Sequence, residues 1–220
     1  MERPLPILKT LAEDLIGVLG YAYNLKLNLK FNEVSELSFD LPRQVDGVET
    51  PYYRRVTAHK LIQLDPYGKF ILAEPTVQGD GVREVKSCTA RSLEQELENS
   101  NLFLEEGTYN FWNPLSTADT VLSRILEAAP GWTVGEVAPS LVGRYRTFDQ
   151  VDAGALSFVY GDCQTAYECV FLFDPYLRQV YRRHSFVEGI RNGGLDFVKA
   201  AVRSSIGHGD CLLYGGFRCV

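Results

Sequence analysis

The sequence predicts a β-rich α+β fold, in which a β-barrel-like unit is followed by a small α+β unit. Short alternations of apolar and polar residues, bounded by turn formers, dominate the first 95 residues, as in barrels and sandwiches. After residue 95, apolar residues at helical spacing appear between short strand-like runs. Twelve Tyr and twelve Phe, against one Met, also favour pleated strands. We therefore expect domains at 1–95 and 96–183 and an atypical segment at 184–220.

Composition and charge limit the possible classes. The chain has 220 residues, of which 45% are hydrophobic and 23% charged, which is ordinary for a globular protein and excludes disordered and collagen-like classes. The net charge is −6, whereas a protein that binds nucleic-acid phosphates usually has a basic face. No stretch approaches 18 consecutive apolar residues. We therefore expect no specific nucleic-acid site and no membrane span.

The clearest strand signal lies at 24–32. Asn and Lys alternate there with Leu25, Leu27, Leu29 and Phe31, which gives one wet face and one buried face. A second alternation covers 37–41 and ends at Pro42. The short connection between the two runs predicts an antiparallel pair.

The rest of the first unit contains one loop and further strands. Turn formers and charges at 42–55 predict a loop. Residues 60–64 and 70–73 flank Asp65-Pro66-Tyr67-Gly68, a turn sequence, and so predict a second hairpin. Another strand is expected at 82–90. By residue 95 we expect five to seven short strands.

The second unit begins with a predicted helix at 117–128. Ser116 and Asp119 have the spacing of a capping box, and Pro130-Gly131 ends the segment. Apolar residues occupy one helical face: Val121, Leu122, Ile125 and Leu126.

Strands, a helix and a hairpin complete this unit. Short strands are predicted at 132–137 and 145–148. A second helix follows, with Leu156, Val159, Tyr160, Cys163 and Tyr167 at helical spacing. The run 169–173 and the return at 178–183 flank Asp174-Pro175-Tyr176, so we expect a final hairpin.

No motif of cofactor or metal chemistry is present. The sequence lacks a P-loop and a dinucleotide-binding glycine motif, and its histidines, at 59, 184 and 208, are far apart. The five cysteines, at 88, 163, 169, 211 and 219, include no CxxC pair and fit reduced thiols better than a disulfide framework. His208 with Cys211, and Cys163 or Cys169 with His184, are candidate dyads, but an incidental placement is favoured.

Two further groups have alternative interpretations. Glu94, Glu96 and Glu98, with Glu105 and Glu106 nearby, fit a solvated face better than a catalytic carboxylate pair. Tyr109, Phe111 and Trp112 fit a strand packed under the helix at 117–128, while a sugar platform or interface anchor stays open. We predict no catalytic, cofactor-binding or metal-binding residues.

Several collinear stretches resemble one family. They are NLKLNLKFNEVSELSFDLP at 24–42, GKFILAEPTVQGDGVREVKSC at 68–88, LEEGTYNFWNP at 104–114, ILEAAPGWTVGEV at 125–137, RYRTFD at 144–149 and AYECVFLFDPYLRQV at 166–180. These stretches are similar to the N-terminal part of siphophage and prophage tail-tip proteins, the baseplate hub or tail-associated lysin family, also called phage minor structural proteins. The resemblance covers about 20–183.

The resemblance implies a virion structural role. A β-barrel-like hub domain would be followed by an α+β hub domain, and three copies would form a homotrimeric ring that closes the tail tube. The implied partners are the distal tail protein, the tape measure protein and, indirectly, the bacterial cell surface. The implied location is the virion tail tip, after synthesis in the host cytoplasm. A lytic or receptor-binding domain would lie C-terminal to the hub, so no catalytic residue is carried over and we expect no enzyme activity.

The resemblance ends after Arg183. Residues 181–220 carry six basic and three acidic side chains, which reverses the sign of the charge of the preceding residues. A truncated or frame-shifted gene product is one hypothesis for this change. Two alternative functions stay open: a fragment of a phage cell-wall hydrolase or endopeptidase, and a host-surface carbohydrate-binding module.

Overall fold

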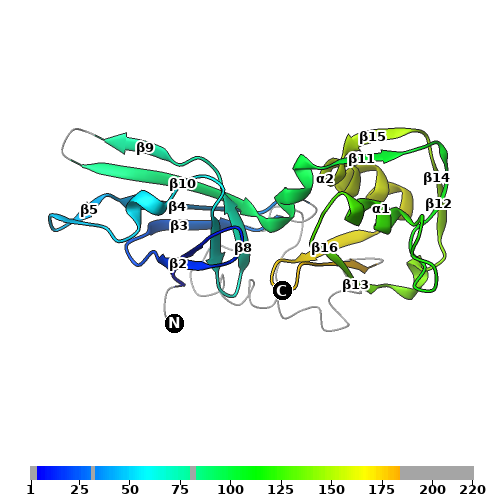
Figure 1. The fold of residues 1–220 in the computed structure, drawn as a ribbon, viewed down its shortest axis with the longest axis horizontal. Coiled ribbons are helices and arrows are strands. Elements are labelled where there is room, and N and C mark those ends of the chain that lie inside the picture. The colour runs from blue at the N-terminus through cyan, green and yellow to red at the C-terminus, as the bar shows by residue number, and fades with distance from the viewer. Residues whose placement is uncertain (1–3, 31–32, 80–82, 184–220) are drawn as a thin grey trace, which may run out of the picture.

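The structure, a computed structural model, describes residues 4–30, 33–79 and 83–183 (Figure 1). A strand-rich lobe comes first, and a lobe of short strands and helices follows. The β-rich α+β class is therefore confirmed. Each lobe contains a cluster of buried apolar side chains. The segment 184–220, together with His184, His208, Cys211 and Cys219, lies outside the described residues.

The first lobe is built on one curved sheet. Its strands follow the order β2-β1-β7-β8-β10-β4-β3, and β9 pairs with β10 beside this path. The pairs within it are antiparallel. Its strands are β1 (Ile7–Lys9), β2 (Leu15–Val18), β3 (Tyr23–Asn28), β4 (Glu36–Pro42), β7 (Leu61–Leu64), β8 (Gly68–Leu72), β9 (Thr76–Gly79) and β10 (Glu84–Ser92). Among the described residues β2 and β3 do not pair with each other, so the sheet is open.

Two hairpins of this lobe confirm the sequence prediction. Strands β3 and β4 pair antiparallel, with Leu27 opposite Leu37. Along β4, the alternate residues Leu37, Phe39 and Leu41 are fully buried, as a strand with one core face requires. Strands β7 and β8 form the second hairpin, around the turn that contains Pro66.

The sequence prediction missed parts of the first lobe. Strands β1, β2 and β9 were not expected, because three- and four-residue runs show too little alternation to be recognised. The predicted loop at 42–55 contains a small hairpin, β5 (Gln44–Val45) with β6 (Val48–Glu49), and the 3₁₀ helix η1 (Tyr53–Arg55). The prediction of five to seven strands before residue 95 is therefore wrong.

The second lobe contains several small sheets together with α-helical and 3₁₀-helical segments. Strand β11 pairs with β15 and β12 with β14, while β17 lies between β13 and β16 and pairs with both. Its elements are η2 (Leu93–Asn99), β11 (Asn101–Leu104), β12 (Gly107–Asn110), α1 (Val121–Glu127), β13 (Thr133–Val137), η3 (Pro139–Leu141), β14 (Tyr145–Phe148), β15 (Val151–Gly154), α2 (Ala155–Phe158), η4 (Val159–Cys163), α3 (Gln164–Tyr167), β16 (Val170–Asp174) and β17 (Gln179–Arg183). The predicted strands at 132–137 and 145–148 and the final hairpin are confirmed. Strands β11 and β15 were missed, whereas β12 contains Tyr109, where a strand was expected.

The first helix of this lobe starts later than predicted. Its cap is Thr120, whose hydroxyl accepts a hydrogen bond from the Ser123 backbone, and the Ser123 hydroxyl closes a capping box. The Ser116 and Asp119 cap was therefore a wrong assignment. Val121, Leu122 and Ile125 are buried as expected. The predicted second helix corresponds to α2, η4 and α3, which follow one another without a break.

The link between the lobes is short. Strand β10 ends at Ser92 and η2 begins at Leu93. Leu93 and Leu97 of η2 belong to the apolar cluster of the second lobe, as does Leu61 of β7. The predicted domain limits at 95 and 183 stay a prediction.

Candidate functional site

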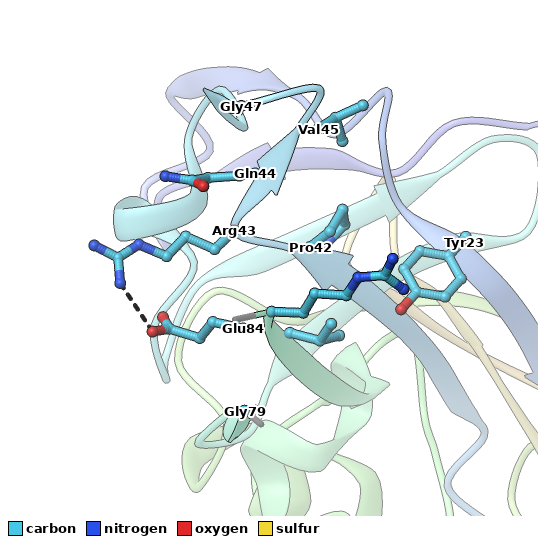
Figure 2. A pocket seen from close by; sticks show the side chains of 10 residues that line it. Tyr23, Pro42, Arg43, Gln44, Val45, Gly47, Gly79 and Glu84 are labelled. Atoms are coloured by element: carbon cyan, nitrogen blue, oxygen red, sulfur yellow. Dashed lines mark hydrogen bonds and ion pairs between the residues drawn. The ribbon is translucent and has the colours of Figure 1, made fainter. Parts of the chain in front are cut away.

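A pocket of about 740 Å³ lies at the end of the first lobe that is farthest from the second lobe (Figures 1 and 2). The β5–β6 hairpin and the adjoining ends of β4, β9 and β10 surround it. Its lining residues are Tyr23, Pro42, Arg43, Gln44, Val45, Gly47, Gly79, Arg83, Glu84 and Val85. The projecting end of the sheet is therefore hollowed.

The polar groups on one wall of the pocket are paired with each other. Arg43 Nη1 donates to Glu84 Oε2 at 2.9 Å, and the Tyr53 hydroxyl donates to Glu84 Oε1 at 2.8 Å (Figure 2). These hydrogen bonds, that of Tyr53 first, lower the pKa of Glu84. Burial and the nearby Glu84 carboxylate raise the pKa of Tyr53. The wall is thus an ion-pair network that anchors η1 to β10.

The opposite edge of the same lobe exposes apolar side chains. Leu15 is 68% exposed and Val18 is 46% exposed, both on β2, which has no partner strand on its outer side among the described residues. Large apolar residues nearby in the chain are also exposed: Leu5, Leu11 and Tyr21. An apolar, uncharged strand edge is a site where another chain can pair. This β2 edge, defined as Leu15–Val18, is the best candidate for an assembly surface.

The candidate dyads stay a prediction, because each has at least one member outside the described residues. Cys163 and Cys169 are buried, and their proposed partner His184 lies outside the described residues, as do His208 and Cys211. Burial raises the pKa of the Cys88 thiol to about 12.

Across residues 4–30, 33–79 and 83–183, no group of three or more His, Cys, Asp or Glu side chains is placed to hold a metal ion. No helix in that same part is long and apolar enough to cross a membrane.

The glutamate run is only partly a solvated face. Glu98, Glu105 and Glu106 are exposed as expected. Glu94 is buried, and its Oε1 accepts a hydrogen bond of 2.6 Å from the Ser92 hydroxyl. Glu96 is half-buried and accepts hydrogen bonds from Arg178 and from Trp132 Nε1. The solvated-face interpretation is wrong for these two residues because η2 turns them toward the body of the protein.

The aromatic cluster packs inside the second lobe. Phe111 is fully buried and its ring lies edge-on to Tyr167, with 4.7 Å between the ring centroids. Tyr109 and Trp112 are half-buried against the same apolar cluster. The three rings therefore do not form an exposed flat platform, and packing accounts for them.

Sequence reasoning missed the pocket wall and the β2 edge. Tyr53 and Arg43 lie in a segment rich in turn formers, where nothing indicates a hairpin that faces Glu84, which is 31 and 41 positions away from them. At the β2 edge, Leu15, Ile16 and Val18 form an apolar run, but it is too short for its alternation to predict a strand.

Comparison with solved structures gives the fold. A prophage tail protein, gp18 of Listeria monocytogenes EGD-e, superposes with a TM-score of 0.58 at 11% identity, over 81% of this chain and 50% of that chain. The tail protein of Neisseria meningitidis MC58 gives a TM-score of 0.53 at 8% identity, over 82% of this chain and 50% of that one. The chain has the fold of phage tail proteins.

A third tail protein shares this fold. The 43 kDa tail protein of prophage MuSo2 from Shewanella oneidensis gives a TM-score of 0.50 at 9% identity, over 83% of this chain and 56% of that chain. The chain thus spans about half the length of the tail proteins that it matches. No protein-family model matches the sequence, and a search of curated proteins finds no match either.

Proposed function

We propose that this chain is a structural component of a phage or prophage tail tip, a baseplate hub protein that forms a trimeric ring closing the tail tube. The observation that carries the proposal is the tail-protein fold shared with three solved tail proteins over about four-fifths of the chain. The collinear resemblance of residues 20–183 to tail-tip proteins points the same way.

The open sheet of the first lobe supports a ring. The two ends of its strand order are different strands, β2 and β3, so contact between β2 of one copy and β3 of the next is heterologous. A heterologous contact closes into a ring of three when each copy is rotated by 120°. The apolar side chains of the β2 edge would then be covered by the neighbouring copy.

The proposed role is non-enzymatic, since the fold is that of tail proteins and the pocket wall is a paired ion network. The proposed partners are a distal tail protein above the ring, a tape measure protein within it and, indirectly, the bacterial surface. The proposed location is the virion tail tip. A lytic or receptor-binding domain would belong to sequence beyond the hub.

The solution mass tests the proposal. We expect light scattering behind a sizing column to give a discrete species of roughly three times 24.7 kDa over a wide concentration range. A mass of 24.7 kDa at every concentration, or a dimer, would contradict the trimeric ring. Electron microscopy of the trimer should show a ring with a central opening, and a compact particle without one would contradict tube closure.

A further inference from the structure

The two Asp-Pro-Tyr turns of the sequence meet in space. One lies between β7 and β8 and the other between β16 and β17, 109 positions apart in the chain. The Tyr176 hydroxyl of the second turn donates a 2.7 Å hydrogen bond to Asp65 Oδ1 of the first. The same carboxylate accepts hydrogen bonds from Gln63 Nε2. The sequence Asp-Pro-Tyr, which occurs once in each lobe, thus makes a contact between the lobes.

A buried lysine strengthens this contact. Lys69, on β8, is only 4% exposed, and its Nζ lies 2.5 Å from Glu13 Oε2. The same ammonium lies 5.6 Å from the centre of the Tyr176 ring, within cation–π range. A buried ammonium needs compensating partners, and Lys69 has two of them, the Glu13 carboxylate and the Tyr176 ring. Lys69 therefore links Tyr176 of the second lobe to the first lobe.

An arginine of the second lobe completes the arrangement. Arg178 donates to both carboxylate oxygens of Glu96 on η2, at 2.6 and 3.2 Å. Such two-point pairs hold the guanidinium in one orientation. In that orientation its Nε lies 3.9 Å from Glu13 Oε1. Glu96 is therefore a positioning residue that directs Arg178 toward the first lobe.

The backbone is strained on both sides of this contact. Glu13 has φ of 70° and Arg178 has φ of 50°, both in the left-handed region that non-glycine residues rarely adopt. Such strain persists only where surrounding contacts hold it. Both residues also carry ion pairs of this contact, Glu13 with Lys69 and Arg178 with Glu96.

We propose that Glu13, Asp65 and Lys69 of the first lobe, with Tyr176 and Arg178 of the second, form an interlobe latch. The latch fixes the angle between the lobes, and the hinge lies where β10 enters η2, at Ser92–Leu93. Figure 1 shows the β16–β17 hairpin turned toward β8, apart from the β10–η2 connection. Besides the latch, Leu61 of the first lobe lies in the apolar cluster of the second lobe, and Val34 and Ile71 pack against that cluster. Relative motion is the default for domains unless their interface is large and hydrophobic, so loss of the latch loosens the hinge.

Hydrogen–deuterium exchange of the full chain tests the latch. In R178Q we expect amide exchange over Leu93–Asn99 and over the turns at 13–14 and 174–178 to become at least ten-fold faster than in the wild type. Exchange in β4 and in the β4-paired part of β10, both within the first lobe, should stay unchanged. R54Q is the matched control, because it breaks the exposed Arg54–Glu49 pair inside the first lobe.

A second, less disruptive variant distinguishes loss of the latch from general destabilisation of the fold. Y176F removes only the hydroxyl that reaches Asp65, and Y145F removes an exposed hydroxyl as its control. We expect Y176F to accelerate exchange in the same three segments by a smaller factor. If R178Q accelerates amide exchange throughout both lobes, the result for Y176F tests the latch. Unchanged exchange in these segments in Y176F, or in a folded R178Q, would overturn the latch.

Discussion

At the scale of single residues, the least expected feature is a carboxyl group inside the protein. Glu94 lies at the start of η2, accepts the Ser92 hydroxyl and has Tyr160 as its neighbour. Burial raises the pKa of Glu94, and the hydrogen bond from Ser92 offsets only part of that effect. Burial, and to a lesser extent the nearby Glu94 charge, raises the pKa of Tyr160.

Glu94 should make stability fall as the pH rises. A raised pKa means that the folded state binds the proton more tightly than the unfolded state. Ionisation above the ordinary glutamate value of 4.5 therefore destabilises the fold until the raised pKa is passed. We expect E94Q to match the wild type at pH 4 and to exceed it by about 1–3 kcal/mol at pH 8. Urea titrations at both pH values measure the difference.

The control for this prediction is E98Q. Glu98 lies on the same helix and is exposed, so its replacement should change the free energy of unfolding by less than about 0.5 kcal/mol at either pH. Equal stability of E94Q and wild type at pH 8 would contradict the prediction, because it would mean that hydrogen bonds offset the whole desolvation cost of the Glu94 carboxylate.

At the scale of elements, the sequence predicted regular alternation well and short pieces poorly. The β3–β4 hairpin was recognisable because Leu37, Phe39 and Leu41 alternate with polar residues. Strand β2 was not, because four residues beside a turn carry little periodic signal. The helix α1 was found from its apolar face, yet its cap was misplaced since Ser116 and Thr120 both precede it with suitable spacing.

The contacts of the candidate surfaces were beyond prediction for a different reason. The Glu84 wall joins residues about thirty and forty positions apart, and the Glu13–Lys69 pair joins residues 56 positions apart. Local propensity contains no information on such pairs, because the sheet order that creates them depends on the whole lobe. The fold class was therefore predictable, whereas the pocket and the latch were not.

The β2 edge leads to a prediction at this scale. Placing a charge on an exposed strand edge opposes pairing with another chain while costing the monomer little. We expect L15K to raise the protein concentration needed for trimer formation by at least ten-fold. The free energy of unfolding of the monomer should change by less than about 0.5 kcal/mol. Analytical ultracentrifugation measures the shift.

Leu115 provides the matched control for this substitution. It is 96% exposed and lies in the second lobe, away from any sheet edge of the first. L115K introduces the same charge into the same residue type and should leave association unchanged. If both variants dissociate to the same extent, general charge and not the β2 edge governs assembly.

At the scale of the whole molecule, the two lobes are joined by one short covalent link, one polar contact and an apolar contact. The first cluster is formed by the curved sheet, and the second by the helices and small sheets around Phe111 and Tyr167. Residues from both lobes enter the second cluster, since Leu61 belongs to β7. The lobes are therefore coupled, and the interlobe latch adds to that coupling.

Calorimetry should reveal how far the latch makes the lobes unfold together. We expect a single transition for the wild type, with the calorimetric enthalpy equal to the van't Hoff enthalpy. In R178Q the ratio of the two enthalpies should rise above one, as the lobes begin to unfold separately. R54Q should behave as the wild type. A ratio that stays at one in R178Q would mean that the apolar contacts alone couple the lobes.

Strand β10 has a mechanical consequence. On one side it pairs with β4 from Val85 to Arg91, and on the other side first with β9 and then with β8. It begins beside the pocket at the projecting end and continues directly into η2. Its nine residues span roughly 30 Å of extended backbone, laterally clamped along the way. A force that pulls on the projecting end along β10 would therefore load all of these hydrogen bonds in shear at the same time. Strand β10 would transmit that force directly to η2 and the second lobe.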